Sequence, residues 1–420
     1  MSPANVEPAA FSIGGKTPLR AVAPASLDEF AAALKACNEA GEAVVICGGG
    51  TMQGVGFAPA RYDVALSTAR LDRVLAYEHR DLTIALECGL TVERLQATLA
   101  ERGQFVPLDA PLPALSTVGG LLSSGWSGPR RAAYGRPRDF VIGTTVVLAD
   151  GTVAKAGGMV VKNVTGYDMS KLWCGSLGTL AALAQANFKT LPLPETARVA
   201  LAPLPEGTRR RAIEHVAALE LEPVAAVALS GFREAGGRDA LEGRLFLMFE
   251  GSQAVVDRAT RELRSALGAA GVPETTLLDG TAASSAFARL LDAYAARLGQ
   301  RSLTYRSSGL PSQAVERCDD IVRAALKRDL HVETLVDALG GDAYVRVSTG
   351  LTADFEDAAK ALDASLGRTS PSRTIFNAPE TVRDALSMWG GVSSLDVVRE
   401  IKARFDPQAT LAPGRYAGRI

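Results

Sequence analysis

The stretch Ala43–Gly56, AVVICGGGTMQGVG, runs a short apolar segment into three consecutive glycines and then into two more. Glycine costs backbone entropy and packs no side chain, so such a cluster usually marks left-handed backbone or backbone that approaches a ligand closely. A phosphate is a common ligand of this kind, because successive N–H groups can form a concave anion-binding nest. A tight turn between two strands is the alternative interpretation of the same glycines.

Two familiar phosphate loops do not fit this sequence. The dinucleotide fingerprint G-x-G-x-x-G finds no register, since the frame from Gly48 ends on Gln53 and the frame from Gly50 has Met52 as its second glycine position. GGKT at 14–17 resembles the end of a P-loop, but Ala10 occupies the place of the first required glycine. Neither a Rossmann domain nor a P-loop is predicted.

Composition bounds the class of protein. The chain has 420 residues, of which 47% are hydrophobic, and a formal net charge of −1, which suits two or three domains and gives no basic surface for nucleic acid. The amino terminus lacks a signal pattern, and no run reaches about 18 apolar residues. We therefore expect a cytoplasmic, soluble protein with no direct membrane insertion and no nucleic-acid partner.

The cysteines and histidines predict no metal site. Five cysteines occur without a C-x-x-C pair, and the three histidines are far apart in the sequence. This pattern indicates neither a disulfide framework nor a structural zinc or iron–sulfur site.

Local signals divide the chain near residues 190–209. Before this point, a capping box at Ser26–Glu29 starts a helix that ends by Gly41, and Ala149-Asp150-Gly151 predicts a hairpin turn. Pro192, Pro194, Pro203 and Pro205 then mark a boundary. After the boundary, strands and helices alternate in a pattern that an antiparallel sheet backed by helices would satisfy, so both parts are of the α+β class.

Two further glycine-rich segments favour a ligand-binding role for the glycines at 48–50 over a simple turn. They are LSTVGGLLSSGWSG at 115–128 and GYDMSKLWCGSLGTL at 166–180. Three separated segments of small residues in one domain suit an extended ligand such as a dinucleotide better than three unrelated turns do.

In their order, these segments resemble the FAD-binding domain of vanillyl-alcohol oxidase and p-cresol methylhydroxylase (PCMH), over Pro18–Pro194. VVKNVTGYDMSKLWCGSLGTL and the carboxyl-terminal ARFDPQATLAPGRYAGRI resemble the FAD-binding subunits of bacterial glycolate oxidase, or glycolate dehydrogenase. Related D-2-hydroxyacid dehydrogenases typically carry Glu at the position of Leu177 and Asn at the position of Ala412.

The resemblance implies an α+β fold with three parts. These are a PCMH-type FAD-binding domain over 1–195, an antiparallel-sheet α+β cap or substrate domain over 196–380, and a carboxyl-terminal segment, 381–420, that returns to the first domain. The loop Gly48–Met52 would wrap the FAD pyrophosphate with backbone N–H groups and the Thr51 hydroxyl, and side chains at the glycines would collide with the cofactor. The implied cofactor-binding residues are Gly48, Gly49, Gly50, Thr51, Met52, Pro111, Ser116, Thr117, Gly119, Gly120, Ser123, Gly125, Gly135, Asp139, Gly175, Ser176, Gly178, Thr179 and Leu180.

Some members of this family tether FAD covalently through histidine or cysteine. Thr51 and Leu115 occupy those positions here, so FAD is expected to bind non-covalently. Cys47 and Cys174 are interpreted as buried structural thiols.

The catalytic residues are not predicted. Oxidation of a 2-hydroxy acid needs a base and a cation for the carboxylate, whereas His215 and His331 stand alone. Tyr344, Arg346 and Ser348 share one face of a predicted strand and could meet a carboxylate, but a solvated sheet face is the favoured interpretation.

The leading hypothesis is an FAD-binding subunit of a complex that oxidises glycolate to glyoxylate. Its partners would be a homologous flavoprotein subunit and an iron–sulfur subunit, which could hold it at the periphery of the inner membrane. The docking surface would lie on Ala197–Pro379 and Arg404–Ile420. The alternatives are a self-sufficient FAD-dependent oxidoreductase for 2-hydroxy acids or alcohols, and a paralogue without a working flavin.

Overall fold

The computed structural model describes residues 4–160, 166–205, 208–218, 221–231, 243–269, 271–272, 274–295, 301–349, 353–367 and 373–420. Residues 161–165, at the centre of the VVKNVTGYD motif, lie outside this range. Contacts separate the chain into two units. The first comprises Met1–Ser127, Arg136–Leu193 and Val392–Ile420, and the second comprises Gly128–Gly135 and Pro194–Gly391.

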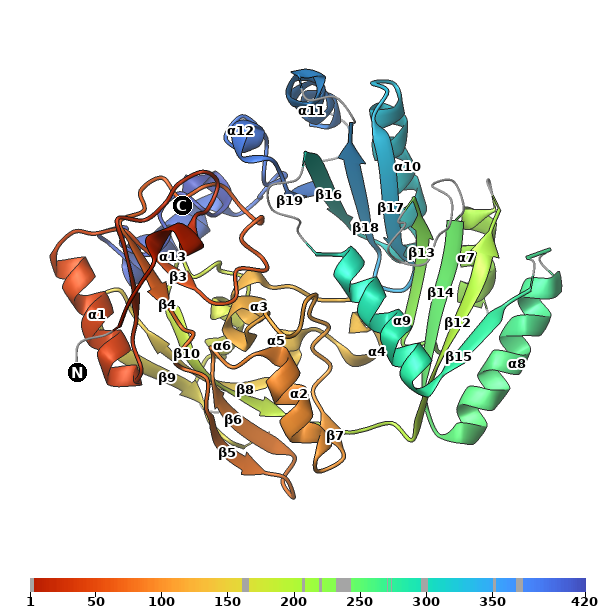
Figure 1. Cartoon of the computed structure of the whole chain (residues 1–420), viewed down its shortest axis with the longest axis horizontal. Helices are drawn as coiled ribbons and strands as arrows, with labels where there is room; N and C mark the ends of the chain where they lie inside the picture. Colours follow the sequence, from red (N-terminus) through yellow and green to blue (C-terminus); the bar gives the residue numbers. More distant parts are fainter. Residues whose placement is uncertain are drawn as a thin grey trace. The chain divides into compact units, whose positions relative to one another are not determined.

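The first unit contains three sheets (Figure 1). The four-stranded sheet, in spatial order, consists of β1 (Ala4–Val6), β2 (Arg20–Ala23), β4 (Val64–Ser67) and β3 (Val44–Cys47). The antiparallel five-stranded sheet consists of β5 (Val74–Glu78), β6 (Thr83–Glu87), β10 (Ala182–Lys189), β8 (Val141–Val147) and β9 (Val153–Gly157). The small sheet pairs β11 (Leu191–Pro192) with β7 (Gln104–Phe105).

The helices of this unit are α1 (Leu27–Glu39), α2 (Val92–Ala100), α3 (Val118–Ser124), α5 (Pro137–Phe140), α6 (Ser170–Trp173), α13 (Leu395–Phe405) and the short η1 (Pro8–Phe11) and η4 (Ala417–Arg419). The α1 cap forms as expected: Ser26 Oγ accepts from Glu29 N–H at 3.2 Å. The apolar face of α1, including Phe30 and Leu34, packs in one core with strand residues of both large sheets and with Leu411.

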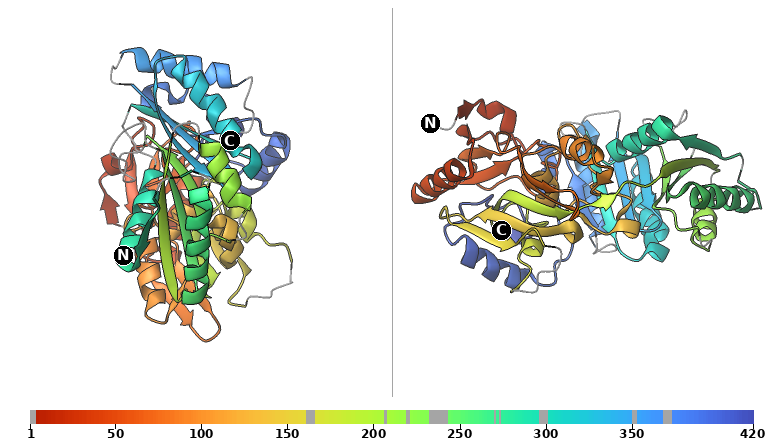
Figure 2. Two further views of the ribbon diagram at one scale, coloured as in Figure 1. Left: turned by 90° about the vertical axis from the view of Figure 1, so that its right-hand side faces the viewer. Right: turned by 90° about the horizontal axis from the view of Figure 1, so that it is seen from below.

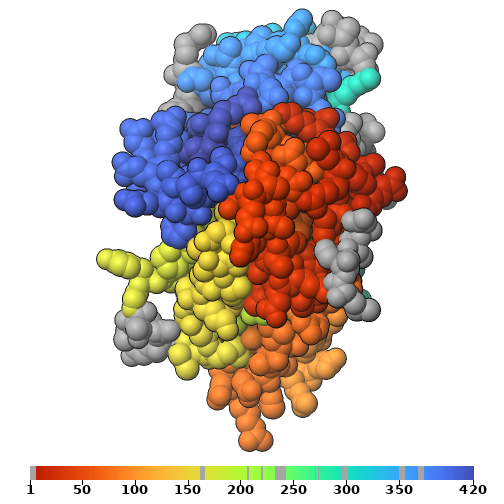
Figure 3. All heavy atoms as spheres, turned by 90° about the vertical axis from the view of Figure 1, so that its left-hand side faces the viewer, coloured from red at the N-terminus to blue at the C-terminus, as the bar shows by residue number. Residues whose placement is uncertain are grey.

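The carboxyl-terminal segment belongs to the first unit. Val44 N–H donates to Thr410 O, and Ala412 N–H donates to Val44 O, each at 2.7 Å, so the segment pairs with β3 in parallel. On the face in Figure 3, blue carboxyl-terminal residues lie directly beside red amino-terminal ones. The β3 strand is therefore completed by residues from the other end of the chain.

The second unit is an eight-stranded antiparallel sheet with helices packed along it (Figure 2). In spatial order its strands are β15 (Thr276–Asp279), β12 (Thr196–Leu204), β14 (Gly243–Gly251), β13 (Ala225–Ser230), β17 (His331–Asp337), β18 (Asp342–Ser348), β16 (Ser302–Ser308) and β19 (Arg373–Asn377). Its helices are α4 (Arg131–Tyr134), α7 (Arg209–Ala218), α8 (Gln253–Ala269), α9 (Gly280–Ala293), α10 (Ala314–Leu326), α11 (Ala353–Leu366), α12 (Glu380–Arg383) and η3 (Pro311–Gln313).

Candidate functional site

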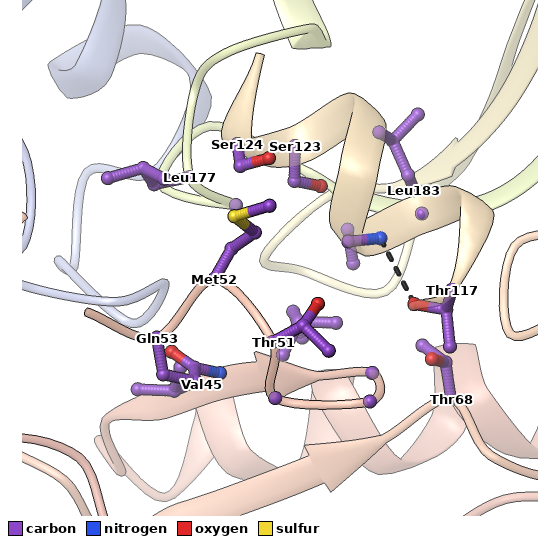
Figure 4. Close-up of a pocket in the computed structure, with 18 of the residues that line it drawn as sticks. Val45, Thr51, Met52, Gln53, Thr68, Thr117, Ser123, Ser124, Leu177 and Leu183 are labelled. Carbon is purple, nitrogen blue, oxygen red and sulfur yellow. Dashed lines mark hydrogen bonds between the residues drawn. The ribbon is translucent and has the colours of Figure 1, made fainter. Parts of the chain in front are cut away.

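A pocket with about 720 Å³ of empty space, including solvent at its mouth, lies in the first unit. Its walls come from β3 and the loop after it, from α3, from the turn that leads into β10, and from one carboxyl-terminal side chain. Figure 4 shows Thr51 and Met52 on one side of the pocket and Ser123 and Ser124 on the other.

The loop after β3 supplies a row of free donors. Within the described residues, the backbone N–H groups of Gly48, Gly49, Gly50, Thr51 and Met52 donate to no protein acceptor. Gly50 adopts a φ of 74°, the left-handed conformation that glycine permits. Gly49 is exposed and its four neighbours in this row are half-exposed, so water can reach these donors. Five consecutive donors that line a pocket are also suited to an anionic ligand, which would take the place of that water.

The first two glycines are required by protein packing. A Cβ at Gly49 would lie 1.7 Å from the carbonyl oxygen of Leu115, and one at Gly48 would lie 2.2 Å from Thr117 Oγ1. A side chain at Gly48 or Gly49 would therefore clash with the second glycine-rich segment even when no cofactor is bound. The two segments pack backbone against backbone, and together they form one wall.

The Thr51 hydroxyl is already committed to the protein. Ser116 Oγ donates to the carbonyl of Pro111 at 2.5 Å, so the 2.9 Å contact between Thr51 Oγ1 and Ser116 Oγ must have Thr51 as its donor. In this arrangement Thr51 contributes its backbone N–H to the pocket, and its hydroxyl proton fastens the loop to Ser116.

The start of α3 forms a wall without free donors. Thr117 caps the helix by accepting from Gly120 N–H at 3.2 Å, while Val118 N–H and Gly119 N–H donate to Leu90 O and Cys88 O. Gly119 packs against Cys88, where a Cβ would approach within 2.8 Å. The helix therefore shapes the pocket, and the loop after β3 provides its donors.

The pocket brings together about half of the residues expected to bind the cofactor. Those that line it are Gly48, Gly49, Gly50, Thr51, Met52, Thr117, Gly119, Gly120, Ser123 and Gly178. Those that do not are Pro111, Ser116, Gly125, Gly135, Asp139, Gly175, Ser176, Thr179 and Leu180.

Several residues of the second group support the wall from behind. Gly125 ends α3 in the left-handed conformation and packs against Gly175, where a Cβ at Gly125 would approach the Gly175 Cα within 3.0 Å. Ser176 Oγ and Thr179 Oγ1 bond to carbonyls of their own turn at 2.8 and 2.7 Å. These interactions hold the turn that carries Leu177 into the pocket.

The Y-G-R-P-R-D segment serves other purposes. Gly135 belongs to the second contact unit, and the Asp139 carboxylate accepts from Arg136 N–H at 2.8 Å to cap α5. A local helix cap accounts for Asp139, and its assignment to the cofactor stays a prediction.

Sequence reasoning missed half of the pocket wall. The additional lining residues are Val45, Ile46, Gln53, Thr68, Ser124, Leu177, Ala181, Ala182, Leu183 and Arg415. Most of them flank the predicted glycine segments, so extending each segment would have found them. Arg415 comes from the carboxyl-terminal segment. The sequence predicts that this segment returns to the domain, but it does not predict which of its residues reaches the pocket.

The thiols near the site are unreactive by environment. Burial raises the pKa of Cys47 to about 11 and that of Cys174 to about 12. Cys47 contacts the Tyr62 hydroxyl at 3.5 Å inside the core. Both thiols remain protonated at neutral pH, as expected of structural cysteines.

The second unit shows no metal cluster within its described residues. Here the expected solvated face on β18 is wrong, because Tyr344 and Arg346 are buried. Tyr344 stacks edge-on against Tyr294 at 4.9 Å, and Arg346 pairs with Glu333 at 3.2 Å. This face of β18 is therefore buried, and the Arg346 guanidinium forms an ion pair with Glu333.

Comparison with known proteins shows which family part of the first unit resembles. Residues 18–157 match a family model described as FAD binding domain. This part of the chain is similar to FAD-binding domains. A row of backbone N–H groups such as that at Gly48–Met52 is suited to negatively charged phosphates.

Curated relatives match about the same region. Glycolate oxidase subunit GlcD of Bacillus subtilis (strain 168) is 34% identical over 181 residues, which are 43% of this chain and 38% of the relative. Glycolate oxidase subunit GlcE of Escherichia coli (strain K12) is 34% identical over 191 residues, 45% of this chain and 51% of the relative. D-2-hydroxyglutarate dehydrogenase of Bos taurus is 34% identical over 177 residues, 42% of this chain and 32% of the relative. The chain thus spans between about a third and a half of these relatives.

Solved structures extend the likeness beyond the FAD-binding domain. p-Cresol methylhydroxylase with substrate bound has a TM-score of 0.72 at 15% identity, covering 95% of this chain and 88% of that one. Alkyldihydroxyacetonephosphate synthase has a TM-score of 0.69 at 17% identity, covering 96% and 78%. These values show a shared fold, and the expected α+β class with a PCMH-like domain is confirmed. No helix among the described residues is long and apolar enough to cross a membrane.

Proposed function

We propose that this chain is the FAD-binding component of an oxidoreductase for small 2-hydroxy acids, with glycolate as the leading candidate substrate. The observation that carries the proposal is the row of five free N–H donors at Gly48–Met52 in an FAD-binding domain. The named relatives, two glycolate oxidase subunits and a D-2-hydroxyglutarate dehydrogenase, support the substrate class.

The proposed division of labour follows the two contact units. Residues 1–127, 136–193 and 392–420 would bind the cofactor, and residues 128–135 and 194–391 would form the cap or substrate domain, so the start of the returning segment moves from the expected residue 381 to residue 392. Bound FAD supplies a hydride acceptor. The chain's own contribution is to hold the pyrophosphate on fixed N–H groups, each such charge-assisted bond being worth roughly 1.5–3 kcal/mol.

The proposal includes partner subunits, a homologous flavoprotein and an iron–sulfur protein. Its support is the set of glycolate oxidase subunits among the relatives and the missing catalytic set: in the described residues His79 and His331 are exposed and solitary, and His215 is half-buried on α7. A self-sufficient oxidoreductase is the competing proposal. It would need a catalytic base and a cation for the substrate carboxylate, and the described residues contain no group of three or more His, Cys, Asp or Glu that could hold a metal ion.

The proposed docking surface for partner subunits includes fewer residues than expected from the sequence. Thr410–Arg415 are buried within the first unit, so this part of the proposed surface Arg404–Ile420 is unsuitable. Exposed residues of the second unit remain candidates for contact with partners.

The test is reconstitution with FAD followed by substrate-dependent dye reduction. Glycolate, D-lactate and D-2-hydroxyglutarate are compared with the isolated chain and with the chain co-expressed with its candidate subunits. We expect one FAD per chain, released into the supernatant by acid precipitation, because Thr51 and Leu115 occupy the positions expected for a tethering histidine or cysteine. Turnover should appear only in the complex.

Other outcomes discriminate clearly. Full turnover by the isolated chain would replace the subunit proposal with the self-sufficient enzyme. Failure of the well-folded chain to bind FAD would overturn the proposed function altogether.

A further inference from the structure

The glycine-rich loop after β3 is held by its own backbone and by side chains from elsewhere in the chain. Its backbone hydrogen bonds include those from Gln53 N–H to Gly50 O at 3.3 Å and from Val55 N–H to Met52 O at 3.1 Å. Its first half is fastened through the Thr51 side chain to Ser116. Its second half receives a comparable fastening from a side chain.

Arg415 provides that fastening from the carboxyl-terminal segment. Its guanidinium donates to Gln53 Oε1 at 2.7 Å, to Gln53 O at 3.4 Å and to Val55 O at 2.7 Å. The side chain is only 2% exposed and also lines the pocket. These three acceptors are neutral oxygens, and the guanidinium carries its positive charge at the wall of the pocket.

The segment that carries Arg415 is held independently of this side chain. It pairs with Val44 through Thr410 and Ala412, as described above. Lys402 Nζ, at the end of α13, donates to Asp406 Oδ2 at 2.5 Å and to Leu411 O at 2.8 Å. The guanidinium can therefore be altered while the backbone around it keeps its own anchors.

We propose that Arg415 is a cofactor-positioning residue: it fixes the second half of the glycine-rich loop and offers a buried positive charge to the FAD pyrophosphate. The proposal rests on the FAD-binding part of the proposed function and is independent of the substrate. A guanidinium suits both tasks, since its planar array of donors can serve two carbonyls at once while its charge stays fixed at neutral pH.

Two substitutions of Arg415 separate the contribution of its charge to FAD affinity from the contribution of its hydrogen-bond geometry. Removing the charge removes an attraction between the buried guanidinium and an anion in the pocket, and salt screens a buried charge less than an exposed one. Replacing the guanidinium by an ammonium keeps the charge but loses the donors that hold both Gln53 and Val55. FAD affinity should therefore decrease in the order Arg415, Arg415→Lys, Arg415→Gln.

The experiment titrates apoprotein with FAD by flavin fluorescence, at low and at physiological ionic strength. Arg415→Gln is expected to raise Kd about 10- to 100-fold, the range for a hydrogen bond to a charged group, and Arg415→Lys to raise it by less. The matched control is Arg419→Gln, which removes the same charge from an exposed position of the same segment that does not line the pocket. Its Kd should stay within threefold of the parent value.

Thermal unfolding of each apoprotein accompanies the titrations. Should Arg415→Gln fail to fold, Arg415→Lys against Arg419→Lys carries the same test, with at least a threefold loss expected. A Kd for Arg415→Gln within threefold of the parent, or equal affinities of folded Gln and Lys variants, would overturn the proposal. Either result with a parent protein that binds FAD leaves the proposed function standing, whereas a parent protein that binds no FAD removes both.

Discussion

Gly49 and Gly50 are neighbours that need glycine for different reasons. At Gly49 any Cβ would meet the Leu115 carbonyl at 1.7 Å, while at Gly50 nothing lies within 4 Å of a built Cβ and the constraint is a φ of 74°. The first is a steric requirement of two packed segments. The second is a conformational preference that costs roughly 1–2 kcal/mol for an L-residue.

Gly49→Ala and Gly50→Ala should therefore behave differently. Gly49→Ala is expected to push the loop away from Leu115, costing about 3 kcal/mol or more of unfolding free energy and weakening FAD binding severely. Gly50→Ala should cost only about 1–2 kcal/mol. Urea unfolding of the apoproteins and FAD titration measure both effects. Equal stabilities for the two variants would contradict the packing explanation.

The carboxyl-terminal segment contains alanines in the left-handed region. Ala409 has a φ of 52° and Ala412 a φ of 42°. Ala412 is the position where related dehydrogenases usually carry Asn, a residue that tolerates this conformation better. The backbone geometry thus gives a physical reason for Asn there, although this chain accepts the strain of alanine.

The same substitution six residues apart should change stability in opposite directions. Ala409→Gly at its exposed site is expected to stabilise the protein by about 0.5–1 kcal/mol, because it removes left-handed strain that exceeds the added entropy of the unfolded chain. Ala403→Gly, exposed within α13, should destabilise it by about 1 kcal/mol. Matched urea unfolding curves test this. Two destabilised variants would show that the positive φ of Ala409 carries no strain.

At the scale of elements, Arg130 and Arg131, at the start of α4, are two half-buried arginines. Although residues 128–135 come between parts of the FAD-binding unit in sequence, Arg130 pairs with Glu250 at 3.0 Å and Arg131 pairs with Asp342 at 2.9 Å, both in the second unit. Removing one partner of such a buried pair typically costs 3–5 kcal/mol. These pairs tie residues 128–135 to the second unit, and the assignment of Gly135 to the cofactor stays a prediction.

Asp337, beside Arg131, makes this cluster sensitive to pH. Burial is the largest influence on its carboxyl, and its pKa is raised to about 7. Arg131 lies 3.7 Å away, Asp342 adds a like charge, and the N–H groups of Leu339 and Gly340 donate to Oδ1. The proton is held more tightly in the folded chain than in the unfolded chain, where aspartate has a pKa near 3.9.

The stability of the parent relative to Asp337→Asn should therefore fall as pH rises. The contribution is fully present below about pH 4 and is lost as the pH approaches about 7, with a slope of at most about 1.4 kcal/mol per pH unit. Asparagine keeps an oxygen for the two N–H donors, so the variant is a close structural match. Urea unfolding of both proteins between pH 4.5 and 8 measures the difference. A difference that does not vary over this range would refute the buried, shifted carboxyl.

Elements with short-range signals were predictable from the sequence. The Ser26 cap and the Asp150-Gly151 turn both form where expected, with Gly151 N–H donating to Leu148 O at 2.9 Å. The covered face of β18 was not predictable, because its alternation of polar and apolar residues suits a solvated sheet. Its burial depends on pairs such as Arg346 with Glu333, which only the tertiary fold brings together.

The candidate site divides in the same way at the scale of the whole molecule. The glycine segments can be recognised from local sequence, since clusters of glycine mark backbone that is left-handed or closely approached by other groups. Arg415 reaches Gln53 across 362 positions of sequence, and no local pattern distinguishes it from a surface arginine. The sequence therefore predicts the N–H donors of the pocket. It does not predict Arg415, which bonds to the second half of the same loop.

Deleting residues 406–420 should remove more than a chain end. The β3 strand would lose Thr410 and Ala412, and Lys402, 7% exposed, would lose its Asp406 partner. An unpaired buried charge costs about 3–5 kcal/mol. We expect FAD binding to be lost and the first unit to unfold at lower urea concentration. Deletion of 418–420 alone should change stability by about 1 kcal/mol or less, and wild-type FAD binding by the longer deletion would contradict the prediction.

The pairing of Gln53 with Arg415 also imposes an order on biosynthesis. At a ribosomal rate of about 5–20 residues per second, the 362 positions between them take about 20–70 s to translate. Throughout that interval the nascent glycine loop lacks its arginine anchor, and β3 lacks its last neighbour. Flavin loading is thereby expected to wait until Arg415 has been synthesised, so a nascent product truncated before this residue would lack a finished place for the cofactor.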